Sequence, residues 1–265
     1  MSLSIADLQK KKANGEKITM ITAYDATFTL LVEAAGIDII LIGDSLGNVI
    51  QGRSTTLPVT LDEMIYHASC VSRVSKHSFL VCDLNFGSYQ CSTEDGLRSA
   101  IRIMKESQVH CVKLEGGARV LELTQAITDA GIPVMGHLGL TPQSVHQMGG
   151  FKVQGRDEKL AAAIKADALA LQDAGASSLV LEGIPRGLAA EITASLAIPT
   201  IGIGAGSDCD GQVLVLQDLL GLNMGKMAKF VKPYAKLGQS TIDAVSQYIA
   251  EVKSGQFPDD AHSYR

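Results

Sequence analysis

Acidic residues end four of the apolar runs in this chain. The runs IILIGD, FLVCD, CVKLE and LVLE end at Asp44, Asp83, Glu115 and Glu182, and a fifth run, IPVMGH, ends at His137. One acid in such a position is most often a helix cap or a solvated strand end, but four of them favour a shared site. If the runs are parallel strands, their carboxyl ends open on one face, so these side chains would converge there.

A lysine lies inside one of these runs. In CVKLE, Cys111, Lys113 and Glu115 share one face of a strand because side chains alternate. A rise of ~3.3 Å per residue places Lys113 about 6.5 Å below Glu115. A lysine is costly to bury unless it meets an anion. Either the neighbouring acids alone neutralise it, or it holds a substrate carboxylate while the acids hold a metal. We favour the second interpretation.

Three of the acids could bind a metal ion. Asp44, Asp83 and Glu115 offer hard oxygen ligands from three successive strand ends, and no Cys/His group has zinc spacing, so Mg²⁺ fits better than Zn²⁺. Mg²⁺ leaves room for a bidentate ligand such as a 2-oxo acid, and as a Lewis acid it lowers the cost of enolate formation. Glu182, on a more distant strand, is the candidate general base.

These side chains need a scaffold that gathers distant strand ends, and the chain alternates short apolar runs with helical segments. We predict strands over residues 18–22, 38–43, 78–83, 110–115, 132–137, 178–182 and 199–204, with an ambiguous eighth around 222–227. We predict helices over residues 26–35, 60–75, 93–107, 118–130, 157–174, 187–196 and 240–253. This order predicts an α/β fold, a (β/α)₈ TIM barrel that forms a single domain over residues 1–265. A doubly wound sheet is the alternative.

Composition and charge exclude several classes of protein. Apolar residues make up 46% of the chain and charged residues 19%, which indicates a folded core rather than disorder. The net charge of −5, without a prominent Lys/Arg run, disfavours nucleic acid and anionic membranes as partners. No apolar stretch reaches the ~18 residues of a membrane span. Five cysteines without a C-x-x-C pair suit a reducing compartment, and the polar amino terminus is unlike a signal peptide, so we expect the cytoplasm.

Two glycine-containing segments are weaker candidates for ligand contact. The sequence IGIGAG (residues 201–206) is as easily explained by close packing at a barrel mouth as by a phosphate-type ligand, since it is not a dinucleotide fingerprint. Residues 136–156 form the longest connection without a helical pattern. Long ordered loops in compact domains are usually functional, so we expect this connection to serve the site.

Ordered motifs along almost the whole chain resemble the ketopantoate hydroxymethyltransferase family. They are TAYD (22–25), GDSLG (43–47), TLPVTLDEMIYH (56–67), VKLEGG (112–117), GHLGLTPQSV (136–145), GGFKVQGR (149–156), LVLEGIP (179–185) and IGIGAG (201–206). The closing SGQFPDDAHSY (254–264) is similar to the family's tail. One position departs: Asn85 stands where the family has proline, and the loss of proline is expected to relax the loop that carries Asp83.

The resemblance implies an enzyme that transfers a hydroxymethyl group from 5,10-methylenetetrahydrofolate to 3-methyl-2-oxobutanoate through a Mg-stabilised enolate. The product would be 2-dehydropantoate, on the route to pantothenate. By resemblance, Asp44, Asp83 and Glu115 would hold one Mg²⁺ per subunit, and Asp44, Ser45, Asp83 and Lys113 would contact the oxo acid. Glu182 would accept the proton from its C3, with His137 in a supporting role. The implied partners are the small oxo acid, the folate and further copies of the chain in a homo-oligomer, commonly a decamer.

Two rival functions stay open at this point. A Mg²⁺-dependent lyase or mutase of the phosphoenolpyruvate mutase and isocitrate lyase type would use similar strand-end acids on a 2-oxo acid, without folate. A barrel that has lost activity and serves as an oligomeric scaffold is the non-enzyme reading. Against it, every acid and the lysine of the predicted site are present.

Overall fold

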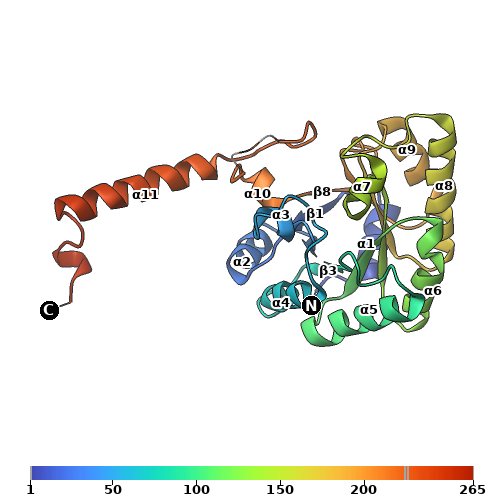
Figure 1. Cartoon of the computed structure of the whole chain (residues 1–265), viewed down its shortest axis with the longest axis horizontal. Helices are drawn as coiled ribbons and strands as arrows, with labels where there is room; N and C mark the ends of the chain where they lie inside the picture. The colour runs from blue at the N-terminus through green and yellow to red at the C-terminus, as the bar shows by residue number, and fades with distance from the viewer. Residues whose placement is uncertain (1, 224, 226, 265) are drawn as a thin grey trace. The chain divides into compact units, whose positions relative to one another are not determined.

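Eight parallel strands close into a barrel in which each strand pairs with the next in the chain and β8 pairs with β1 (Figure 1). The computed structural model describes residues 2–223, 225 and 227–264. The predicted α/β barrel is confirmed. The strands are β1 (Ile18–Thr22), β2 (Ile39–Ile42), β3 (Phe79–Asp83), β4 (Cys111–Glu115), β5 (Val134–Gly139), β6 (Ser178–Glu182), β7 (Thr200–Ile203) and β8 (Gly211–Leu214).

Helices follow most of the strands, and several begin at a residue whose side chain caps the first turn. The Thr60 side chain accepts the Glu63 N–H and the Glu63 side chain accepts the Thr60 N–H, which fixes the start of α4. The helices are α1 (Ile5–Ala13), α2 (Ala26–Ala34), α3 (Leu46–Val49), α4 (Leu61–Ser72), α5 (Thr93–Ser107), α6 (Leu121–Asp129), α7 (Val145–Met148), α8 (Glu158–Asp173), α9 (Arg186–Ser195), α10 (Leu216–Leu219) and α11 (Leu237–Ser254). Short 3₁₀ turns are η1 (Ala118–Val120), η2 (Pro142–Ser144) and η3 (Asp260–His262).

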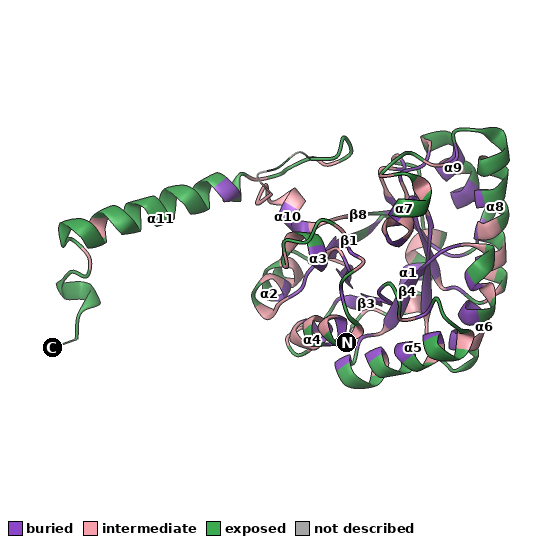
Figure 2. Cartoon of the chain, viewed as in Figure 1, coloured by how far each residue is buried: buried purple, intermediate pink, exposed green. Residues whose placement is uncertain are grey.

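Two apolar cores hold the barrel together, and Figure 2 shows the buried strands inside a more exposed ring of helices. The larger core packs the helices against the outside of the strands. The smaller core fills the barrel interior with one or two residues from each strand, and Leu8 of α1 joins it. Ion pairs from Lys11 to Asp38 and from Lys12 to Asp210 tie α1 to residues that precede β2 and β8. Helix α1 therefore covers the amino-terminal end of the barrel, which leaves the carboxyl end for a site.

The eighth strand was predicted in the wrong place. It is β8, at Gly211–Leu214, rather than residues 222–227, of which 224 and 226 lie outside the described residues. Its sequence, GQVL, is too short and too polar to stand out as an apolar run. Glycine is required at its start, because a Cβ on Gly211 would lie 2.4 Å from the Ile18 carbonyl oxygen. Barrel closure therefore depends on a close backbone approach that hydrophobic periodicity does not reveal.

The chain divides into two compact units, residues 1–215 with the barrel and residues 216–265 with α10 and α11. The expectation of a single domain over the whole chain stays a prediction. In the second unit, α11 exposes the apolar side chains of Ile242, Val245, Tyr248, Ile249 and Val252. None of the helices in the described residues is long and apolar enough to cross a membrane.

Candidate active site

The alternation of side chains along the strands aims the predicted site residues at the barrel axis. Val81, Cys111, Met135 and Val180 all belong to the apolar core inside the barrel. Residues two positions further along a strand point the same way. These residues are Asp83, Lys113, His137 and Glu182, with Glu115 two positions beyond Lys113. They therefore rise in a layer above the interior core, at the carboxyl ends of β3, β4, β5 and β6.

Strand register places these side chains opposite one another. In the parallel sheet Asp83 is the partner of Lys113, and Glu115 is the partner of His137. The Nζ atom of Lys113 lies 2.9 Å from Asp83 Oδ1 and 3.3 Å from His137 Nδ1. His137 lies between two carboxylates, with Nδ1 3.4 Å from Glu115 Oε1 and Nε2 3.2 Å from Glu182 Oε2. The structure thus brings these five residues together, as the strand-end pattern predicted.

Asp44 and Ser45 follow β2 and complete the cluster. The Asp44 backbone N–H donates to Asp83 Oδ2 at 3.0 Å. Ser45 precedes α3, and its hydroxyl lies 2.8 Å from the Tyr24 hydroxyl. Glycine at position 43 leaves room for the Ser45 hydroxyl, because a Cβ there would lie 2.9 Å from Ser45 Oγ. Ser45 therefore lies at the edge of the site, with a hydroxyl that Tyr24 orients.

The cluster is buried and dominated by acids. Asp44, Asp83, Lys113, Glu115 and His137 are each at most 4% exposed. Burial raises the pKa of Asp44 well above its ordinary value, and the negative charges of Asp83 and Glu115 raise it further. Burial disfavours the charged Lys113, but the three neighbouring acids outweigh it and raise its pKa. The site therefore holds the charged Lys113 among several acids that repel one another.

His137 is held as a cation by the acids on either side. Burial and Lys113 lower its pKa, but Glu115 and Glu182 outweigh them and raise it to about 9. Burial likewise raises the pKa of Glu115, yet His137, Lys113 and the Gln143 N–H bring it below its ordinary value. His137 and Glu115 thus form a buried, ionised pair beside Glu182. This geometry gives His137 a larger place in the site than its strand-end position alone suggested.

Gln143 and Tyr89 belong to the site, and sequence reasoning missed both. The Gln143 side-chain amide donates to Asp44 Oδ2 at 2.9 Å, and its backbone N–H donates to Glu115 Oε2 at 3.0 Å. Its Oε1 accepts the Tyr89 hydroxyl at 2.7 Å. Gln143 lies in η2, within residues 136–156, so the long connection does serve the site. An uncharged glutamine in a loop gives no chemical signal of its own; the available clues were the length of the connection and the motif GHLGLTPQSV that contains it.

The donor set suits a hard divalent cation such as Mg²⁺. Asp44, Asp83 and Glu115 offer carboxylate oxygens only, and their mutual repulsion is what a bound cation would relieve. Asp83 Oδ1 is buried and accepts no well-aligned hydrogen bond, although Lys113 pairs with it electrostatically. Among the residues that the structure describes, no three such side chains already surround one metal position. The carboxylates fit Mg²⁺ by chemistry, and binding would require them to reorient.

Two other sequence features add no acid or base to the cluster. In IGIGAG, Ile203 pairs with Glu182 along the β6–β7 ladder, whereas Gly202 packs on Cys209 and Gln212, and Gly206 packs on Arg186. Two hydrogen bonds of Asn85 restrain the loop in place of a proline ring. Its side-chain amide donates to the Val59 carbonyl at 2.6 Å and to the Phe86 carbonyl at 3.0 Å. The loop after Asp83 is therefore fastened by hydrogen bonds.

A closed parallel barrel with an acid–base cluster at its strand carboxyl ends defines a barrel enzyme. Sequence comparison gives the family. A family model described as ketopantoate hydroxymethyltransferase matches residues 2–260. The chain is 53% identical to 3-methyl-2-oxobutanoate hydroxymethyltransferase of Geobacter sulfurreducens, over 98% of each chain. It is 54% identical to the protein of that name in Moorella thermoacetica, over 99% of this chain and 98% of the relative. The chain belongs to the ketopantoate hydroxymethyltransferase family.

Solved structures with a similar fold come from other enzymes. A 2,3-dimethylmalate lyase of the PEP mutase/isocitrate lyase superfamily aligns over 99% of this chain and 92% of its own, with a TM-score of 0.62 and 19% identity. A phosphonopyruvate hydrolase aligns over 100% of this chain and 92% of its own, with a TM-score of 0.63 and 11% identity. At these identities the likeness shows the barrel fold alone.

Proposed function

We propose that this protein is a hydroxymethyltransferase that converts 3-methyl-2-oxobutanoate to 2-dehydropantoate for pantothenate synthesis, with 5,10-methylenetetrahydrofolate as donor. Family membership over nearly the whole chain carries this proposal. The reaction removes the C3 proton of the oxo acid and joins C3 to the donor's one-carbon unit. Water supplies the hydroxyl oxygen, and tetrahydrofolate leaves. The buried cluster supplies the groups that such a reaction needs: a base, a cation for a carboxylate and oxygen ligands.

Each residue of the cluster has a role in this proposal. Asp44, Asp83 and Glu115 would hold one Mg²⁺ per subunit, which as a Lewis acid lowers the cost of removing the C3 proton. Lys113 and Ser45 bind the substrate carboxylate, with Asp44 and Asp83 beside them. Glu182 accepts the C3 proton. His137, 3.2 Å from Glu182, holds the base in position and keeps a positive charge between Glu182 and Glu115.

A proton NMR assay in D₂O tests the function directly. The protein is incubated with 3-methyl-2-oxobutanoate and either Mg²⁺ or EDTA, and 5,10-methylenetetrahydrofolate is then added. We expect the C3 proton signal to disappear only when Mg²⁺ is present. We then expect 2-dehydropantoate to form only after the folate is added. Exchange without transfer would instead favour a lyase or mutase acting on a 2-oxo acid. No exchange by folded protein would support a binding or scaffold role.

The proposal also includes the partners and the compartment. Besides the two small molecules, we expect further copies of this chain, since α11 exposes apolar side chains that a monomer would leave in water. The resemblance implies a decamer. The five cysteines are all free, which suits the reducing cytoplasm.

A further inference from the structure

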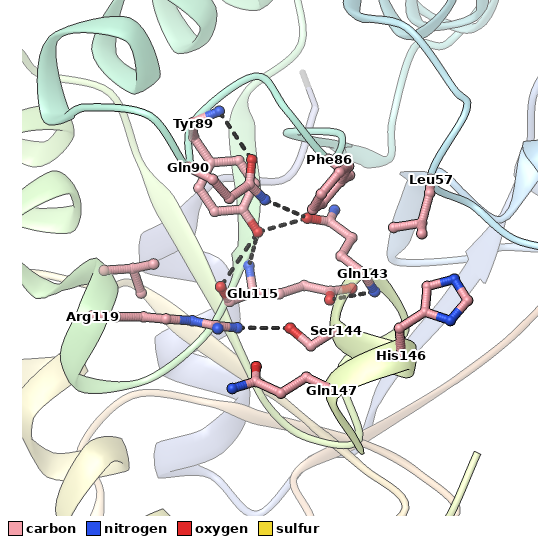
Figure 3. Close-up of a pocket in the computed structure, with 11 residues that line it drawn as sticks. Leu57, Phe86, Tyr89, Gln90, Glu115, Arg119, Gln143, Ser144, His146 and Gln147 are labelled. Carbon is pink, nitrogen blue, oxygen red and sulfur yellow. Dashed lines mark hydrogen bonds between the residues drawn. The ribbon is translucent and has the colours of Figure 1, made fainter. Parts of the chain in front are cut away.

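A cavity of about 450 Å³ adjoins the acid cluster, between the loop that follows β3 and the segment that follows β5 (Figure 3). Its volume is in the range of small-molecule sites. Glu115 and Gln143 line it and are buried, whereas Phe86, Arg119 and His146 line it and are exposed. The cavity thus runs from the buried acids to solvent. The roles assigned to the cluster do not account for its outer part.

The apolar part of the cavity suits a flat ring. Phe86 and Leu57 lie on the same side in Figure 3, and Phe86 is 43% exposed. An exposed phenylalanine at a cavity mouth offers an aromatic face without a partner ring among the described residues. The Asn85 side-chain amide donates hydrogen bonds to the Val59 and Phe86 carbonyls, and these bonds fix the backbone beside this ring. Phe86 is therefore a positioned stacking surface.

Side-chain amides provide a polar edge for such a ring. Gln90 Nε2 donates to Gln143 Oε1 at 3.1 Å, and both residues line the cavity. Gln147 adds a third amide (Figure 3). The Gln143 amide is fully engaged within the protein, since its nitrogen donates to Asp44 and to the Leu84 carbonyl and its oxygen accepts from Tyr89 and Gln90. Gln147 and the second amide hydrogen of Gln90 are therefore the groups that can meet a heterocycle with amide and amino groups on one edge. Through Gln143, this polar edge connects directly to Asp44.

Arg119 provides the cavity with a positive charge that has no acidic partner. Its guanidinium donates to Ser144 Oγ at 2.8 Å. Within the described part of the chain, no carboxylate lies within ion-pair distance of it. An exposed guanidinium held by a neutral serine is free to pair with a ligand carboxylate.

We infer that this cavity is the binding site of the one-carbon donor, a reduced pterin with a glutamate tail. The pterin ring stacks on Phe86, its amide edge faces Gln90 and Gln147, and a tail carboxylate pairs with Arg119. This inference rests on the proposed function and adds to it the location of the donor. A donor held there lies next to Glu115, so the two substrates meet at the buried end of the cavity.

Titration calorimetry with tetrahydrofolate under argon tests the site in two variants. Phe86→Ala removes the stacking face and should weaken binding at least ~5-fold. Arg119→Gln should weaken it several-fold and reduce its dependence on salt, because one ion pair is lost. The matched controls Tyr66→Ala and Arg73→Gln change an exposed aromatic residue and an exposed arginine on or just after α4, away from the cavity, and should keep wild-type affinity.

Proton exchange at C3 without donor separates this inference from the proposed function. If Phe86→Ala and Arg119→Gln lose tetrahydrofolate affinity by a larger factor than they lose exchange rate, the donor site is confirmed. If wild-type protein transfers the one-carbon unit but both variants bind tetrahydrofolate as wild type does, the donor binds elsewhere and the inference is wrong. If wild-type protein exchanges C3 but binds no tetrahydrofolate, the inference fails together with the folate-dependent function.

Discussion

At the scale of single residues, Glu182 is the group whose role can be isolated most clearly. It ends β6 with its carboxylate toward His137, and it lies outside the set of proposed metal ligands. Glu182→Gln should therefore leave affinity for Mg²⁺ and the oxo acid nearly unchanged while slowing C3 exchange by ~10²-fold or more. NMR in D₂O measures the rate, with Glu191→Gln on α9 as control. Exchange at the wild-type rate would show that another group takes the proton.

Gln143 is a positioning residue with a separate test. Its side-chain amide donates to Asp44 and accepts from Tyr89, and its backbone N–H donates to Glu115. Gln143→Met keeps the volume and the backbone bond but removes the amide, so we expect affinity for Mn²⁺, read by electron paramagnetic resonance, to fall ~10-fold. Gln125→Met, on the exposed face of α6, is the control. If the variant binds Mn²⁺ as tightly as the wild type but is less thermally stable, Gln143 has a structural role and does not position the metal ligands.

At the scale of elements, one carboxylate connects α2 to the turn before β3. Glu33 accepts the backbone N–H groups of Lys76, His77 and Ser78 as well as the Ser75 hydroxyl. Burial opposes its charge, yet these donors lower its pKa to about 2. Because the folded pKa is below the unfolded value near 4.5, its stabilisation is complete above about pH 5 and is lost as pH falls toward 2.

Glu33→Gln should therefore lower the free energy of unfolding by roughly 1–3 kcal/mol at pH 7. Urea denaturation at pH 7 and pH 3 measures this difference, which should shrink at pH 3 because the wild-type carboxylate loses part of its advantage there. Glu191→Gln, an exposed ion-pair partner, should change the free energy by less than about 1 kcal/mol at either pH. A Glu33 effect that is equal at both pH values would contradict the assignment.

The loop after β3 depends on a single side-chain amide. Asn85 is buried and bonded to the Val59 carbonyl, so Asn85→Ala leaves that carbonyl without this partner. We expect the free energy of unfolding to fall by about 1–2 kcal/mol in urea denaturation. Asn48→Ala removes a hydrogen bond from a side-chain amide to the Arg53 carbonyl at an exposed position. It should lower the free energy of unfolding by less than about 0.5 kcal/mol. Equal losses in the two variants would show that the Asn85 bond adds nothing beyond an exposed one.

At the scale of the whole molecule, α11 bears on the proposed homo-oligomer. Ile242, Val245, Ile249 and Val252 recur at spacings of three and four residues and form one exposed apolar stripe. Replacing Val245 and Ile249 with lysine should lower the molar mass in solution, measured by light scattering after size exclusion, without changing far-ultraviolet circular dichroism. Lysine in place of Gln247 is the control. A wild-type protein that runs as a monomer would refute the oligomer.

The sequence by itself determined the barrel and the strand-end side chains that meet at its mouth, because both depend on local patterns. Alternating apolar runs and helical segments gave seven strands near their observed positions, and an acid at the end of a run marks a strand's carboxyl end wherever the strand lies. Register and loop packing could not be derived this way. Only the tertiary structure placed β8 at residues 211–214, set His137 between Glu115 and Glu182, and brought Gln143 to Asp44, 99 residues away. These contacts join residues distant in the chain, and whether a glutamine or a short polar strand takes part depends on the neighbours that the closed barrel supplies.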